Sequence, residues 1–195
     1  MSKKYHKLDR NNQFTKNYLD ESLKIANYQT TLTNDIFDIY EIIIEALNRG
    51  GKILLCGNGG SASDAQHIAA ELVNRFKIDR DPIPALALTT DTSILTSIAN
   101  DYGYEFIFSK QIQAIGTKDD VLIAISTSGS SKNILNALDT AKNIGLKTII
   151  FTGENYKNSN LDKVINIPSK ETGVIQQSHI TLLQLICGLV ENSIT

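Results

Sequence analysis

Residues 52–63 read KILLCGNGGSAS, an apolar run that ends in a turn containing three glycines and two serines. A short apolar run bounded by glycines is typical of a buried β-strand. The pattern recurs in VLIAISTSGSS at residues 121–131, where five hydroxyl side chains surround one glycine. Helical periodicity follows both turns, over 63–76 and 131–144. Strands that pass through such turns into helices predict an open parallel sheet, with the ligand at the carboxyl ends of the strands.

The rest of the chain fits the same architecture. Further strands are predicted at 83–88, 147–151 and 163–167, and further helices at 92–100 and 105–115. Residues 14–49 predict two helices, the second beginning near Thr33 or Asn34 and ending at Gly50. Residues 173–194 predict a long, mostly apolar closing helix, buried either in the domain or in a subunit interface. The expected fold is α/β, a five-stranded parallel sheet covered by helices on both faces.

The bulk properties limit the classes of function. A chain of 195 residues is one domain of ordinary size, which we place at 13–195 after a flexible polar stretch at 1–12. Its formal net charge of −2 gives no general attraction to nucleic acid or to an anionic membrane. No apolar run reaches the 18 or so residues of a membrane span, and the start lacks the apolar core of a signal peptide. We expect a cytoplasmic protein with Cys56 and Cys187 as reduced core thiols.

The two hydroxyl-rich loops are suited to phosphate. Glycines let backbone N–H groups approach an anion, and Ser61 or Ser63 can cap the next helix, whose positive end adds attraction. Neither loop is a P-loop or a dinucleotide fingerprint. Either loop alone fits equally well a strand–helix turn with good capping, but the pair favours a phospho-ligand site. Hydroxyls in place of Arg or Lys indicate a monophosphate on a polyol.

Three long motifs, GNGGSASDAQHIAAEL, LTTDTSILTSIANDYGYEFIFSKQ and AISTSGSSKNIL, resemble the sugar isomerase (SIS) family and specifically the phosphoheptose isomerases. The resemblance covers residues from about 50 to the C-terminus. It implies the SIS fold, a homotetramer with active sites between subunits, and N-terminal helices used in oligomerisation. It also implies conversion of sedoheptulose 7-phosphate to D-glycero-D-manno-heptose 7-phosphate for surface polysaccharide, and a bound Zn²⁺ in many members.

One helix is predicted to carry the chemistry. His67 and Glu71 lie four residues apart and therefore share a helix face, which by itself most often means an exposed ion pair. The resemblance implies that His67 and Glu71 are both metal ligands and that Glu71 also takes part in proton transfer. Aldose–ketose isomerisation needs a base to move a proton between C1 and C2 and an electrophile to polarise the carbonyl. We take Glu71 as the base, although a tight metal ligand is a weaker base.

Together the loops and the resemblance predict two sets of site residues. Asn100 and Asp101 enter by analogy, and the plain alternative for them is a helix-ending turn. The substrate contacts are expected from Asn58, Gly59, Gly60, Ser61, Glu71, Asn100, Asp101, Ser126, Thr127, Ser128, Ser131 and Gln176. The Zn²⁺ ligands are expected from His67, Glu71, Gln176 and Gln184.

The closing helix departs from the family pattern R-I-Q-E-x-H with a second histidine five residues later. Gln176 and His179 match it, whereas Val174, Gln177 and Gln184 replace the arginine, the glutamate and the second histidine. An amide does not titrate near neutrality, so Gln184 cannot shuttle a proton and is a weaker metal ligand. For His179 we favour a histidine satisfied within the helix packing over a catalytic one.

Three hypotheses follow. The first is a phosphoheptose isomerase with Glu71 as base, in which a metal or water takes the acid role. The second is a non-catalytic SIS module that binds a sugar phosphate or, as some relatives do, the bacterial replication initiator; those relatives tend to lose both the helix glutamate and the second histidine. The third is an isomerase for a different ketose phosphate.

Overall fold

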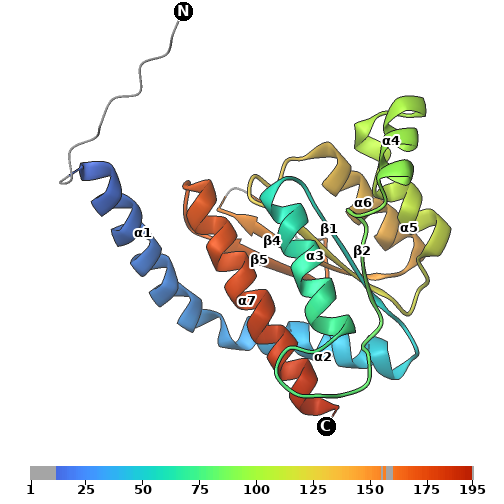
Figure 1. Cartoon of the computed structure of the whole chain (residues 1–195), viewed down its shortest axis with the longest axis horizontal. Coiled ribbons are helices and arrows are strands. Elements are labelled where there is room, and N and C mark those ends of the chain that lie inside the picture. The colour runs from blue at the N-terminus through green and yellow to red at the C-terminus, as the bar shows by residue number, and fades with distance from the viewer. Residues whose placement is uncertain (1–11, 155, 157–159, 195) are drawn as a thin grey trace, which may run out of the picture.

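The computed structural model describes residues 12–154, 156 and 160–194 of the chain. Helices and strands alternate as predicted (Figure 1). In chain order they are α1 (Gln13–Gln29), η1 (Thr30–Leu32), α2 (Thr33–Asn48), β1 (Ile53–Gly57), α3 (Gly60–Val73), β2 (Ala85–Ala87), α4 (Thr92–Asp101), η2 (Tyr104–Phe106), α5 (Ser109–Ile115), β3 (Val121–Ser126), α6 (Lys132–Ile144), β4 (Lys147–Gly153), β5 (Lys163–Ile167) and α7 (Thr172–Ser193).

The five strands form one sheet in the order β2-β1-β3-β4-β5, and every neighbouring pair is parallel. This confirms the predicted α/β fold. From β1 the chain moves outward to β2 on one side, and from β3 it moves to β4 and β5 on the other. The order therefore reverses between β1 and β3, and open sheets bind ligands outside the carboxyl ends of the strands at such a point.

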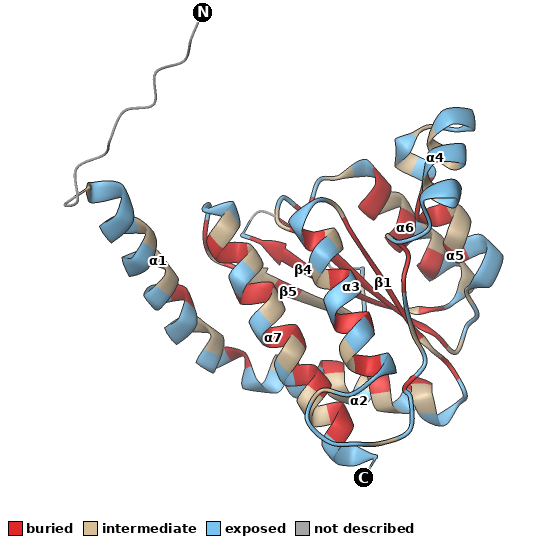
Figure 2. Ribbon diagram, viewed as in Figure 1, coloured by how far each residue is buried: buried red, intermediate tan, exposed pale blue. Residues whose placement is uncertain are grey.

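Apolar cores cover both faces of the sheet, which is why the central strands are apolar at every position. Alternate residues of β1 serve opposite faces: Ile53 and Leu55 pack with α2, α3 and α7, whereas Leu54 and Cys56 pack with α5 and α6. All residues of β1 are buried (Figure 2), and so are all residues of β3. A rigid, dry sheet thus fixes where the two central loops begin.

Some predicted boundaries shift. Helix α3 begins at Gly60, three residues before the predicted start, because the glycine-rich turn is already part of its first turn. The predicted helix 105–115 is divided into η2 and α5. Of the stretch predicted as flexible, residues 1–11 lie outside the described residues, and Asn12 caps α1 by accepting a hydrogen bond from the Phe14 N–H at 2.8 Å.

Helix α7 is the one described helix that is long and apolar enough, by length and composition, to cross a membrane. Half of that apolar window is buried inside the domain, where α7 packs against α1, α2, α3 and β4. A core helix of a soluble protein passes the same test, so its composition reflects packing within the domain.

The two cysteines are free and buried, as predicted, and lie on different elements. Burial raises the pKa of both Cys56 and Cys187 to about 12. Since the thiolate is the reactive form, both side chains act as small apolar groups of the core.

Candidate active site

A small cavity lies where β1 and β3 end, at the point where the strand order reverses. Its volume is about 60 Å³, room for roughly four or five water-sized atoms, which suits a single phosphate group. It is lined by Asn58, Ser61, Ile125, Ser126, Thr127, Ser128, Ser131 and Gln176. Seven of these are predicted substrate contacts, so the fold brings both hydroxyl-rich loops and the closing helix to one place.

The first loop depends on glycine for its shape. Gly59 is the N-cap residue of α3 at φ 55° and ψ −121°, a conformation that side chains disfavour. The expectation that Ser61 or Ser63 caps this helix is wrong, because the cap position falls on Gly59 and carries no side chain. Ser61 instead lies inside the helix and lines the cavity.

Gly60 follows at the first position of α3, against the side chain of Gln176 from α7. A Cβ at Gly60 would overlap the Gln176 amide, so a larger residue there would displace that side chain from its present position. This contact explains why a residue more than 100 positions away reaches the first loop. The predicted place of Gln176 in the phosphate site is consistent with this packing.

The second loop leads from β3 into α6. The Gly129 N–H donates to the Ser126 carbonyl at 3.1 Å, and the Ser130 hydroxyl donates to Ser128 Oγ at 3.1 Å. Ser131 is the N-cap residue of α6, yet its side chain makes no capping hydrogen bond. Hydroxyls and the positive end of α6 therefore meet at the cavity, which is an arrangement that attracts anions.

An amide pair beneath the first loop was missed from the sequence. The side chains of Asn58 and Asn133 exchange two hydrogen bonds, at 2.9 and 2.8 Å. Tyr104 adds a third, since its hydroxyl donates to Asn58 Oδ1 at 3.0 Å. These bonds use the acceptor atom of Asn58 and leave one amide N–H for a ligand. No sequence spacing signals this network, because its members come from three separate elements.

His67 and Glu71 share one face of α3, as predicted, with His67 Nε2 2.9 Å from Glu71 Oε1. Asp64, one turn earlier, is a further carboxylate that the sequence analysis did not single out. Burial raises its pKa, an effect partly opposed by the charge of nearby His67. Within the described part of the chain, no group of three or more His, Cys, Asp and Glu side chains could hold a metal ion. One imidazole and one carboxylate are therefore the strong donors, and any further ligand would be an amide.

The residues of α7 separate into two groups. Gln176 reaches the cavity, and the partly buried Gln184 lies eight residues further on, about 12 Å along the helix axis. Val174, where the family pattern has arginine, is 1% exposed and belongs to the apolar core. The arginine position is thus occupied here by a packing residue.

His179 is completely buried. Its Nε2 lies 3.3 Å from the Thr152 carbonyl, and its ring meets Phe151 edge-on at 6.0 Å. Burial lowers the pKa of His179 to about 4, although the contact with Thr152 opposes the shift. His179 is therefore a buried packing residue, as favoured from the sequence, but it is not fully satisfied, because its Nδ1 has no hydrogen-bond partner among the described residues.

Asn100 and Asp101 do not line the cavity. They end α4, where Asn100 Nδ2 donates to Asp101 Oδ1 at 2.8 Å, and both side chains are exposed. This is the geometry of the plain helix-ending turn. Their contact with sugar hydroxyls stays a prediction.

Comparisons with known proteins agree with this architecture. The family model described as SIS domain matches residues 6–153. A phosphoheptose isomerase of Thermodesulfovibrio yellowstonii is 53% identical over 159 residues, 80% of this chain and 79% of the relative. Two solved structures are also similar. A phosphoheptose isomerase from Neisseria gonorrhoeae has a TM-score of 0.83 and 37% identity over 92% of this chain and 98% of its own. One from Francisella tularensis has a TM-score of 0.87 and 34% identity over 91% and 96%.

The switch-point cavity, the parallel sheet and the matching profile define the class: the chain belongs to the SIS domain family. The relatives narrow the assignment. Within that family, the chain belongs to the phosphoheptose isomerases.

Proposed function

We propose that the chain interconverts sedoheptulose 7-phosphate and D-glycero-D-manno-heptose 7-phosphate, supplying a heptose precursor for surface polysaccharide in the cytoplasm. The observation that carries the proposal is the convergence of both hydroxyl-rich loops and Gln176 on one phosphate-sized cavity. The hypothesis of a non-catalytic binding module is not favoured, because a relative that is 53% identical is named as a phosphoheptose isomerase.

In the proposed reaction the phosphate occupies the cavity and is held by hydroxyls and by the positive ends of α3 and α6. The sugar extends from there along α3. Glu71 removes a proton from C1 of the ketose while water protonates the carbonyl oxygen at C2, which gives an enediol. Glu71 then returns the proton to C2 as the C1 hydroxyl gives up its proton to water and becomes the aldehyde. Its side chain is 20% exposed, so it is reachable by substrate without being fully solvated.

A Zn²⁺ ion, one per subunit, is part of the proposal. His67 and Glu71 would hold it, and amide oxygens of Gln176 and Gln184 would complete the set, so binding is expected to be weak. Because these two glutamines lie about 12 Å apart along α7, both would reach one ion only through their long side chains or across a subunit interface. When bound, Zn²⁺ would polarise the carbonyl of the substrate. The donor types fit a zinc site, and the replacement of a histidine by Gln184 reduces its strength.

The test is turnover of sedoheptulose 7-phosphate by the purified chain, with and without added Zn²⁺, followed as aldose formation. We expect turnover that Glu71→Gln abolishes, whereas Glu45→Gln, the same change on an exposed face of α2, leaves it intact. Gln184→His should tighten Zn²⁺ binding and accelerate the reaction. If no turnover above background is seen at high enzyme concentration, the proposed isomerase activity is wrong. If a different ketose phosphate is turned over faster, the proposed substrate is replaced by that compound.

A homotetramer joined through the N-terminal helices is also proposed. Helix α1 projects from the body of the molecule (Figure 1), and among its described residues only Ile25 is buried. Leu19 and Leu23 lie one turn apart on the same face of α1 and are each more than 60% exposed, so a single chain leaves this apolar pair uncovered. Light scattering should give four copies, and Leu23→Glu should lower the number. A monomeric wild-type protein would contradict this proposal.

A further inference from the structure

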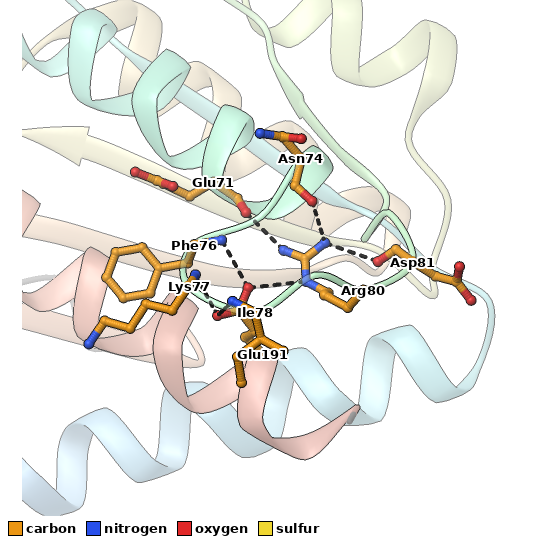
Figure 3. Close-up of polar contacts among 8 residues, drawn as sticks. All are labelled: Glu71, Asn74, Phe76, Lys77, Ile78, Arg80, Asp81 and Glu191. Carbon is orange, nitrogen blue, oxygen red and sulfur yellow. Dashed lines mark hydrogen bonds and ion pairs between the residues drawn. The ribbon is translucent and has the colours of Figure 1, made fainter.

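A buried polar cluster lies at the end of α3 that is remote from the phosphate cavity (Figure 3). Its centre is the guanidinium of Arg80, whose side chain is 4% exposed. Arg80 comes from the segment between α3 and β2, which has no regular secondary structure. A charged group buried to this degree needs partners on every side.

Arg80 binds the last turn of α3. One of its terminal nitrogens donates to the Glu71 carbonyl at 2.8 Å, and the other donates to the Asn74 carbonyl at 3.2 Å. The last carbonyls of a helix have no partner within the helix. Here the Ala70 carbonyl accepts from the Asn74 N–H, and the Leu72 carbonyl accepts from the Ile83 N–H. The Glu71 carbonyl, between them, is satisfied by Arg80.

Glu191 of α7 holds Arg80 and its segment in place. Its carboxylate is 1% exposed and accepts the backbone N–H groups of Phe76, Lys77 and Ile78 at 2.8–3.1 Å. Its Oε1 lies 3.5 Å from Arg80 Nε. Burial alone would raise the pKa of Glu191, but these three bonds and the charge of Arg80 lower it, so it stays ionised. Helix α7 thereby holds in place the segment between α3 and β2, whose Arg80 binds the last carbonyls of α3.

Glu71 shows two different ends in this cluster. Its carbonyl faces Arg80, while its carboxylate points away from the guanidinium (Figure 3). Arg80 therefore contacts the backbone of the proposed base, whose carboxylate lies against His67 instead, with Oε1 2.9 Å from His67 Nε2. A bond at the carbonyl holds the last helical turn and so the point from which the Glu71 side chain leaves the backbone, while the contact with His67 orients the carboxylate.

We propose that Arg80 and Glu191 are positioning residues that hold Glu71 in the geometry needed for proton transfer. The inference rests on the proposed role of Glu71 as base. It makes a specific kinetic prediction, because the phosphate is bound at the other end of α3, near Gly60, eleven residues or about 16 Å away along the helix. Greater mobility of the last turn of α3, which carries Glu71, should lower kcat. The affinity for the phosphate group, and so KM, should stay nearly unchanged.

The test compares Glu191→Gln and Arg80→Lys with a matched control elsewhere in the fold. Lysine carries the same charge but cannot reach two carbonyls with a planar fork. The control is Asp120→Asn, because Asp120 is also 1% exposed, accepts backbone N–H groups from Lys52 and Thr117, and pairs with a cation, Lys52 at 2.7 Å. Asp120 directly precedes β3, and its side-chain partners Lys52 and Thr117 belong neither to α3 nor to the segment that carries Arg80.

We expect kcat to fall at least tenfold in Glu191→Gln and in Arg80→Lys, with KM within twofold of wild type. Asp120→Asn should keep kcat while losing comparable stability towards urea. Amide hydrogen exchange should speed up over residues 71–78 in the two cluster variants only. If Glu191→Gln does not fold, Arg80→Lys decides the matter.

Unchanged kcat in a folded Arg80→Lys variant would overturn the inference, as would an equal loss of kcat in Asp120→Asn or a rise in KM with kcat preserved. Glu71→Gln is measured alongside. If Glu71→Gln abolishes turnover while Arg80→Lys retains it, the positioning role alone fails. If Glu71→Gln retains turnover, the proposed base fails and the positioning role fails with it.

Discussion

Replacement of His179 by glutamine should remove a pH-dependent part of the stability of this protein. In the folded chain His179 is buried and its pKa is about 4, against an ordinary value of 6.5. The unfolded chain therefore binds a proton at pH values where the folded chain does not. Stability is complete above pH 6.5 and is lost as pH falls towards 4.

The size of the effect follows from the two pKa values. Their difference of about 2.5 units corresponds to roughly 3 kcal/mol once both states are fully protonated. Between pH 7 and pH 5 the wild-type chain should lose about 2 kcal/mol through this group alone. Other titrating groups, such as the buried Glu191, are present in both proteins and cancel in the comparison.

The assay is urea unfolding of wild type and His179→Gln at pH 7, 6 and 5. We expect the variant to be less stable at pH 7, because the packing around position 179 is disturbed, and the gap to narrow by about 2 kcal/mol at pH 5. His179→Leu, which also lacks a titrating group, serves as the second variant and should narrow the gap equally. A gap that stays constant over this range would refute the assignment of His179 as a buried neutral residue.

Two further predictions concern the cavity. Gly60→Ala should raise KM at least tenfold, because the new methyl group displaces the Gln176 amide. The midpoint of urea unfolding should change little, since alanine suits a helix. Calorimetric titration with the substrate would check the loss of affinity, and an unchanged affinity would contradict the prediction. Tyr104→Phe removes one hydrogen bond to Asn58, worth about 1 kcal/mol, and should raise KM about fivefold. Tyr102→Phe is the control, because Tyr102 and Tyr104 are both 59% exposed but the ring of Tyr102 lies under the Lys110 ammonium rather than against Asn58. Equal kinetic constants in the two variants would count against a role of the network in substrate binding.

Much of the architecture could be predicted from local patterns. The apolar runs became β1 and β3 because a strand buried on both faces needs apolar residues at every position. The turn glycines marked the point where the strands end and the helices begin. The position of the cap could not be predicted, because a serine and a glycine both suit a helix start, and only the backbone shows that Gly59 occupies it.

The residues of the candidate site could be predicted where they are continuous in the chain, but not where the site joins distant segments. The loop residues follow directly from sequence, since each loop is continuous in the chain. Gln176 needed the family resemblance, and the Asn58–Asn133–Tyr104 network was missed because its bonds join residues 46 to 75 positions apart. Hydrogen bonds over such separations leave no periodic signal.

The two hydroxyl-rich loops and the His67–Glu71 pair were determined by the sequence itself, because residues within one strand–turn–helix segment are held together by local geometry. Only the tertiary structure decided which groups share an environment. It buried His179 and Val174, brought Gln176 against Gly60, and set Arg80 between the backbone of Glu71 and the carboxylate of Glu191. The physical reason is that burial and pairing depend on how distant segments pack, which no local pattern specifies.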